Sequence, residues 1–146
     1  MKKAGFTLIE LLMASVILVI LAAVVAPNFA RWEVRAKESE VKSVTHSVQM
    51  AVEDYKATPG WEGSYPSTAS ELQWVAQYYL PSSVQSKKNP FNLAEDYGTV
   101  GSGLRFGYYT GVGQICYGYS SQVNRYTIVA MGGTHGVTIL TLMEGQ

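Results

Sequence analysis

Residues 6–26 read FTLIELLMASVILVILAAVVA, and they decide how the rest of the chain is organised. This stretch holds a single ionisable side chain, that of Glu10. A helix needs about 20 consecutive, mainly apolar residues to cross the hydrocarbon core of a bilayer. The stretch therefore predicts a transmembrane helix at the N-terminal end of the chain.

The flanks of this stretch indicate its orientation and separate it from a secretory signal. The leader before it, MKKAG at residues 1–5, carries Lys2 and Lys3, which predict a cytoplasmic N-terminus. A secretory signal has an apolar region of about 7–15 residues that ends in a small-x-small cleavage site. The run here is longer, contains Glu10 and ends in VVAP at residues 24–27. A secretory signal therefore fits poorly.

The residues after Pro27 continue the helical pattern with one apolar face. Proline removes a backbone hydrogen bond and bends a helix, so Pro27 predicts a kink rather than an end. The apolar positions at helical spacing are Val34, Val41, Val44, Val48, Ala51 and Tyr55. Favourable pairs four residues apart are Glu33–Lys37 and Glu38–Lys42. One helix is therefore expected from residue 6 to residue 57, ended by TPG at residues 58–60.

Residues 58–103 predict a long connecting region with one short helix. TASE at residues 68–71 has the form of a capping box, and apolar residues at helical spacing follow it as far as Leu80-Pro81. NPFN at residues 89–92 is typical of a turn.

From residue 104 the apolar period changes to two. Alternating stretches at 104–108, 115–119 and 126–130, and an apolar stretch at 137–142, predict four strands. Because the connections are short, we expect an antiparallel meander over residues 104–143. The predicted fold class is α+β, with a long N-terminal helix (a transmembrane half and an amphipathic half) packed on a small antiparallel sheet.

The composition offers little for catalysis or cofactor binding. The formal net charge is zero, and the only two histidines, His46 and His135, lie far apart in the sequence. Cys116 is the only cysteine, so neither an intrachain disulfide nor a multi-cysteine metal site is possible; we expect it to be buried and inert. The glycine-rich residues 98–118 match no phosphate-binding motif. We expect no enzymatic activity, no catalytic residue and no cofactor.

Two polar clusters contain residue types that could bind a ligand. Oxygen ligands for calcium are offered by Asn89, Asn92, Glu95 and Asp96, but their spacing matches no EF-hand, and no metal site is predicted. Cations near tyrosines that could hold DNA are Lys87, Lys88, Arg105 and Arg125. From Arg31 onward there are nine basic and ten acidic residues, so no basic field supports nucleic-acid binding.

The segment GFTLIELL, residues 5–12, resembles the type IV prepilin signature, in which Gly precedes Phe and Glu is the fifth residue counted from that Phe. The resemblance extends to Pro27, where the family also places a proline. It implies that a prepilin peptidase and methyltransferase cleaves between Gly5 and Phe6 and methylates the new Phe6 amino group. It also implies that Glu10 pairs with the Phe6 ammonium of a neighbouring subunit during assembly.

The resemblance implies a structural subunit of a type IV pilus-type filament. The expected divisions are a leader (1–5), a filament-core helix (6–30) and a globular domain (31–146), the last with a helix continuation (31–57), a connecting region (58–103) and a sheet (104–143). Expected partners are further copies of the chain, the peptidase, an inner-membrane assembly platform and, before assembly, membrane lipid. The precursor is expected in the inner membrane and the product in an extracellular pilus or periplasmic pseudopilus.

Two alternatives stay open. A pseudopilin of type II secretion shares the same N-terminal signature, although its major members bind calcium near a C-terminal end that here offers only Glu144. From a different class, a single-span membrane protein could carry a soluble ligand- or DNA-binding domain. In that protein the bond between Gly5 and Phe6 would stay intact.

Overall fold

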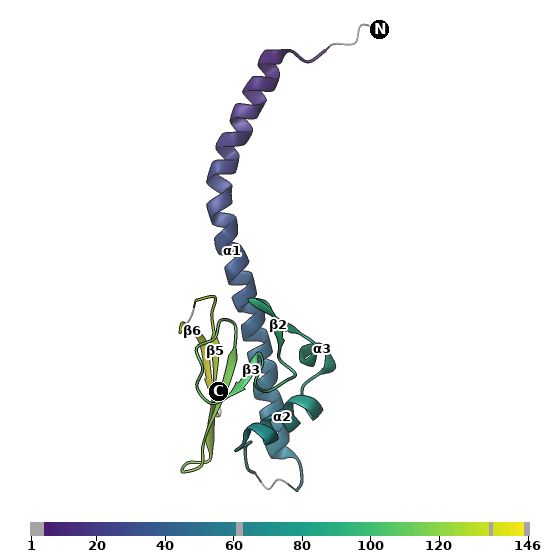
Figure 1. Cartoon of the computed structure of the whole chain (residues 1–146), viewed down its shortest axis with the longest axis vertical. Helices are drawn as coiled ribbons and strands as arrows, with labels where there is room; N and C mark the ends of the chain where they lie inside the picture. The colour runs from purple at the N-terminus through teal and green to yellow at the C-terminus, as the bar shows by residue number, and fades with distance from the viewer. Residues whose placement is uncertain (1–4, 61–62, 135, 145–146) are drawn as a thin grey trace. The chain divides into compact units, whose positions relative to one another are not determined.

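The structure is a computed structural model that describes residues 5–60, 63–134 and 136–144. The chain divides into two compact units, residues 1–35 (the N-terminal unit) and residues 36–146 (the globular unit). Helix α1, Leu8–Ala57, supplies residues to both units, and every other element belongs to the globular unit (Figure 1). The predicted α+β class with a long N-terminal helix is confirmed.

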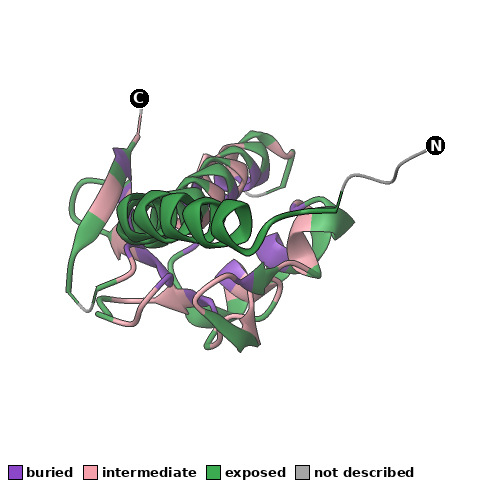
Figure 2. Ribbon diagram, turned by 90° about the horizontal axis from the view of Figure 1, so that it is seen from above, coloured by how far each residue is buried: buried purple, intermediate pink, exposed green. Residues whose placement is uncertain are grey.

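The N-terminal unit is a helical segment without a core of its own. Every described residue from Gly5 to Arg35 is exposed, and this segment is green throughout in Figure 2. Ser15 donates its hydroxyl to the Leu12 carbonyl at 2.8 Å, so the polar group is satisfied inside the helix. Pro27 lies inside α1, which continues past it as predicted, while the predicted kink stays a prediction. In the described part of the chain, α1 is the one helix long and apolar enough to cross a membrane.

The second half of α1 buries one face in the globular unit. Its buried residues are Val41, Val44, Thr45, Val48, Ala51, Val52 and Tyr55. The predicted apolar stripe is therefore confirmed from Val41 to Tyr55, whereas Val34 is 43% exposed and lies in the N-terminal unit. Glu38 was expected to pair with Lys42, but its carboxylate accepts a hydrogen bond from the Gly133 N–H at 3.2 Å.

The region between α1 and the main sheet contains more structure than predicted. Helix α2 is Ala69–Tyr78, where Thr68 accepts a hydrogen bond from the Glu71 N–H, as the capping pattern indicated. Further elements are α3 (Ser82–Gln85), β1 (Lys88–Asn89) and β2 (Asn92–Asp96), and the two strands form an antiparallel hairpin around the predicted turn. The hairpin was not predicted because β1 has only two residues and β2 shows no alternating burial.

The main sheet has four strands in the order β3-β4-β5-β6. Their bounds are Leu104–Phe106, Ile115–Ser120, Arg125–Met131 and Thr138–Met143, close to the predicted stretches. The pairs β4–β5 and β5–β6 are antiparallel, as expected. The pair β3–β4 is parallel, so the prediction of an all-antiparallel meander is wrong there. A long crossover is unnecessary because β3 has only three residues, and the chain must return by only about 10 Å before β4 begins.

The two faces of this sheet have different neighbours. One face joins the main core with α1 and α2, through residues that include Leu104, Tyr117, Ile128 and Leu142. The other face carries a smaller buried cluster of Cys116, Val129 and Met131. The Cys116 thiol is buried and donates to the Tyr109 carbonyl at 3.4 Å, and burial raises its pKa, so the prediction of a buried cysteine is confirmed.

Candidate processing and assembly site

The first turn of α1 places Glu10 against the start of its own helix. The Thr7 hydroxyl accepts a hydrogen bond from the Glu10 N–H at 3.3 Å, while Glu10 Oε2 accepts from the Thr7 N–H at 3.0 Å. The same Oε2 accepts from the Thr7 hydroxyl at 2.8 Å. This reciprocal arrangement is a capping box, and it satisfies backbone donors that a helix start otherwise leaves unpaired. The TLIE pattern at residues 7–10 could have predicted it.

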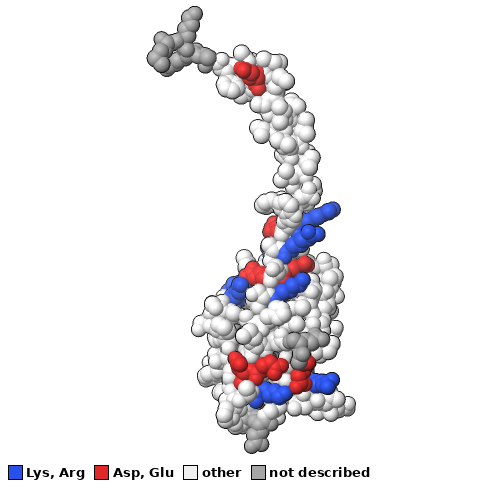
Figure 3. All heavy atoms as spheres, turned by 180° about the vertical axis from the view of Figure 1, so that it is seen from behind, with Lys and Arg blue, Asp and Glu red and all other residues white. Residues whose placement is uncertain are grey.

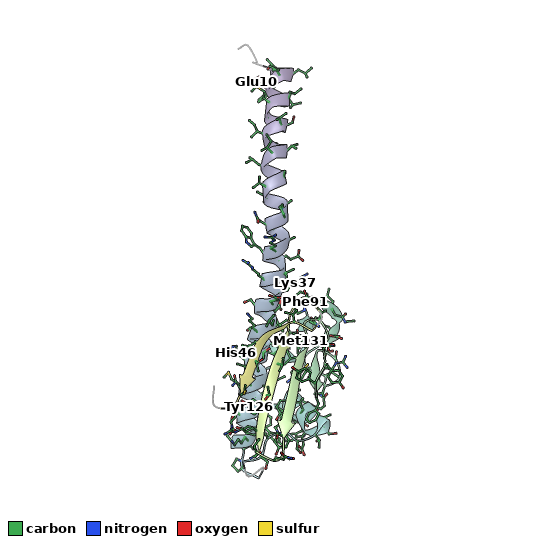
Figure 4. All side chains as sticks on the ribbon, turned by 90° about the vertical axis from the view of Figure 1, so that its left-hand side faces the viewer. Glu10, Lys37, His46, Phe91, Tyr126 and Met131 are labelled. Carbon is green, nitrogen blue, oxygen red and sulfur yellow. The ribbon has the colours of Figure 1, made fainter. Side chains whose placement is uncertain are left out.

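The carboxylate of Glu10 keeps one oxygen available. In the described residues all of its hydrogen bonds go to Oε2, and Oε1 has no partner. Figure 4 labels Glu10 on the first turns of α1, and Figure 3 shows a single acidic patch on this part of the helix. The site can therefore receive a cation at Oε1 without losing its cap.

Gly5 and Phe6 lie just before this cap and are open to solvent. Phe6 is 83% exposed. A Cβ added at Gly5 would meet no atom within 4 Å. The fold therefore has no steric need for glycine at residue 5, and a requirement for it would have to come from a partner that handles the bond between Gly5 and Phe6.

Two of the four calcium candidates of the connecting region, Asn89 and Glu95, are engaged with donors of the protein. Glu95 accepts hydrogen bonds from Asn89 Nδ2 and Gln114 Nε2, both at 2.9 Å, and lies 3.7 Å from Arg105. Asn89 Oδ1 accepts from the Phe91 N–H at 3.0 Å. These contacts close the hairpin β1–β2 onto residues 105–114, and they give Asn89 and Glu95 a structural role.

The four cations considered for nucleic acid each lie beside a carboxylate. The pairs are Lys87–Glu40, Lys88–Asp96, Arg105–Glu95 and Arg125–Glu144, at 3.2, 3.7, 3.7 and 4.0 Å. In the described part of the chain, each of these cations therefore has an opposite charge nearby.

A polar network in the globular unit was not predicted, because its members lie far apart in the sequence. Glu53 accepts hydrogen bonds from Tyr126 at 2.6 Å and from Tyr65 at 3.2 Å. Lys56 donates to Tyr65 at 2.8 Å and to Glu144 at 3.0 Å. Burial raises the pKa of Tyr65 to about 12, and the bond from Lys56 lowers the pKa of Glu144. The network therefore ties the end of α1 to β5 and to the residue after β6.

Two comparisons with known proteins give a match to this chain. Residues 1–26 match the family model described as the prokaryotic N-terminal methylation motif. Over 42 residues the chain is 48% identical to the type IV major pilin protein PilA of Myxococcus xanthus (strain DK1622). That match covers 29% of this chain and 19% of the relative, so the likeness spans about a fifth of the relative's length. No solved structure matches the chain significantly.

The family-model match includes Gly5, Phe6 and Glu10. The globular unit contributes the α+β architecture, in which a long N-terminal helix accompanies small sheets. The N-terminal methylation motif and the similarity to a major pilin support the resemblance of this segment to type IV pilins, and the architecture fits that resemblance.

Proposed function

We propose that the chain is a structural subunit of a type IV pilus-type filament. One observation carries the proposal: every described residue of the N-terminal unit is exposed, and no residue of its most apolar window is buried within the chain. Burial of apolar surface contributes about 25 cal/mol per Å². A segment with no core of its own gains this free energy only from outside the chain, first from a bilayer and then from other copies of the same segment.

The exposed junction before α1 is the proposed site at which the precursor is cleaved and methylated. We assign Gly5–Phe6 as the bond cut by a membrane prepilin peptidase, and Phe6 as the residue that is then N-methylated. The open surroundings of Gly5 support this assignment, because a protease needs free access to the backbone. Methylation preserves the positive charge of the new amino group.

Glu10 is the proposed assembly residue. When the apolar helices of several copies pack together, the Phe6 ammonium of an incoming subunit needs an anion inside an apolar bundle. The vacant Oε1 of Glu10 supplies it, while Oε2 keeps the cap. A buried ion pair contributes register more than net stability, so the apolar surface drives assembly and Glu10 fixes the axial position.

The precursor is then a single-span protein of the inner membrane, with a cytoplasmic leader and the globular unit on the far side. An assembly platform in that membrane would extract the mature subunit into the filament. The product serves as a structural polymer rather than as an enzyme.

Mass spectrometry of the mature N-terminus tests the proposal directly. Protein recovered from sheared filaments should begin with N-methyl-Phe6, and Gly5→Leu should leave an uncut precursor in the membrane. Ala4→Leu is the matched control one residue earlier and should be cut normally. An intact Met1 terminus on filament protein would contradict the proposal, and so would normal cleavage of the Gly5→Leu variant.

A further inference from the structure

The uncharged part of α1 is bracketed by Glu10 at one end and Arg31 at the other. Residues 11–30 carry no ionisable side chain. At 1.5 Å per residue these residues extend about 30 Å, which is the thickness of a bilayer's hydrocarbon core. When Glu10 lies at one headgroup level, Arg31 therefore lies at the other.

Three exposed side chains gather at the Arg31 end of this window. Arg31 and Arg35 are four residues apart, and Trp32 lies within about 100° of both around the helix axis. Trp32 is 61% exposed, and both arginines are exposed as well. All three belong to the N-terminal unit, in which no described residue is buried.

The two arginines are also uncompensated by the chain itself. Neither forms an ion pair in the part of the chain that the structure describes. Neighbouring charges have other contacts, since Glu33 is engaged within the chain and Lys37 lies 5.9 Å from the Phe91 ring (Figure 4). Two guanidinium groups on one helix face are therefore free to bind an external anion.

We propose that Arg31, Trp32 and Arg35 form an outer-leaflet anchor that binds the phosphate groups of anionic phospholipids in the unassembled subunit. Guanidinium groups bind phosphate through paired hydrogen bonds, and tryptophan favours the boundary between headgroups and acyl chains. The anchor fixes the depth of the span, and it holds Glu10 at the opposite headgroup level until assembly. This inference rests on the membrane-inserted precursor of the proposed function and is independent of filament formation.

Depth-resolved quenching of Trp32 tests the anchor in the full-length chain. The other two tryptophans are changed by Trp61→Phe and Trp74→Phe, and the chain is reconstituted into vesicles of phosphatidylethanolamine and phosphatidylglycerol. Quenchers near the headgroups should quench Trp32 more strongly than quenchers at mid-bilayer. Strong quenching by aqueous iodide with none by lipid, or strongest quenching at mid-bilayer, would overturn the proposal.

Lipid preference is the second measurement. Brominated phosphatidylglycerol should quench Trp32 more than equally brominated phosphatidylcholine, since each arginine near an anionic surface contributes about a fivefold preference. Arg31→Gln/Arg35→Gln should remove the difference, and the corresponding lysine variants should keep part of it. Lys42→Gln, in the globular unit, is the control and should leave the preference unchanged.

Three further outcomes would count against the anchor. Equal quenching by the two lipids would show that the arginines face something else, such as carboxylates of another copy. Loss of the preference on adding inorganic phosphate, beyond the loss caused by sodium chloride of equal ionic strength, would show a site for free phosphate instead. A preference that survives Arg31→Gln/Arg35→Gln would assign it to other residues. Failure of filament assembly alone would leave all these readouts unchanged.

Discussion

The N-terminal unit and the globular unit differ in how far their apolar side chains are exposed. In the N-terminal unit, Leu8, Val19 and Phe29 are 83%, 68% and 64% exposed. In the globular unit, Val48, Leu72 and Ile128 are at most 1% exposed. Both units draw residues from the same helix, so helix formation alone does not decide burial. The difference lies in whether the chain supplies a partner for the apolar face.

Filament yield should respond most strongly to a change at Glu10. Glu10→Ala should insert and be cleaved normally, but assembly should collapse, because an unpaired charge in an apolar bundle costs about 3–5 kcal/mol. Electron microscopy of sheared filaments, set beside precursor and mature subunit levels in the membrane, is the measurement. Glu10→Gln should assemble poorly, and Glu10→Asp should retain some assembly.

Thr7→Ala separates the two roles of this carboxylate. It removes the hydroxyl of the cap at a cost of about 1 kcal/mol and leaves the charge of Glu10 in place. Filaments should persist in this variant. Normal filament yield from Glu10→Ala, with normal cleavage, would show that the carboxylate has no part in assembly.

Deleting residues 1–30 should leave a soluble, folded globular unit. The globular unit keeps its core without them, because every residue of that core lies between Val41 and Leu142. Circular dichroism should show mixed helix and sheet, and unfolding should be cooperative. An aggregated or unfolded product would mean that the N-terminal residues belong to the fold, and the contrast between the units would fail.

Two matched Ile→Ala substitutions in the full-length chain compare what a side chain in each unit contributes to stability. Ile128→Ala removes a fully buried side chain and should lower the free energy of unfolding of the globular unit by about 2–5 kcal/mol. Ile20→Ala, in a position that is 60% exposed, should leave that free energy unchanged. Denaturant unfolding in detergent, followed by circular dichroism, makes the comparison. Equal effects of the two changes would show that the units are energetically coupled.

The smallest expected effect concerns Glu144 and acid. Its pKa lies below the ordinary value of 4.5, chiefly because Lys56 donates a hydrogen bond to it. The stabilisation is therefore complete above the pKa of the unfolded chain and is lost as the pH falls through the folded pKa. Glu144→Gln should flatten the acid limb of the plot of stability against pH for the soluble globular unit. An unchanged acid limb would show that the contact is solvent-screened and contributes nothing.

The parts of the fold that were predicted rest on local patterns. The stripe from Val41 to Tyr55 repeats at helical spacing, and the Thr68 cap and the strand alternation are readable over a few residues. Val34 fits the same spacing and is nevertheless exposed. Helical spacing identifies an apolar face of the helix, but it does not tell whether another element covers that face.

The parts that were missed depend on chain reversal or on distant partners. The three-residue length of β3 permits its parallel pairing with β4, and alternation alone does not reveal that direction. Lys56 meets Glu144 across 88 positions, a contact that no local pattern encodes. At the candidate site the motif predicts roles for Gly5, Phe6 and Glu10, and the TLIE pattern at residues 7–10 also indicates the contact between Thr7 and Glu10.

The core that buries the α1 stripe is completed only late in synthesis of the chain. Tyr55 completes the stripe, yet Leu142, which joins the same core from β6, is made 87 residues later. At a ribosomal rate of about 5–20 residues per second, this interval lasts about 4–17 s. Until it ends, the valines of the helix lack the complete sheet that covers them in the folded unit. The nascent globular unit is thus most exposed to aggregation after its helix is finished, and the last strand to be made ends that risk.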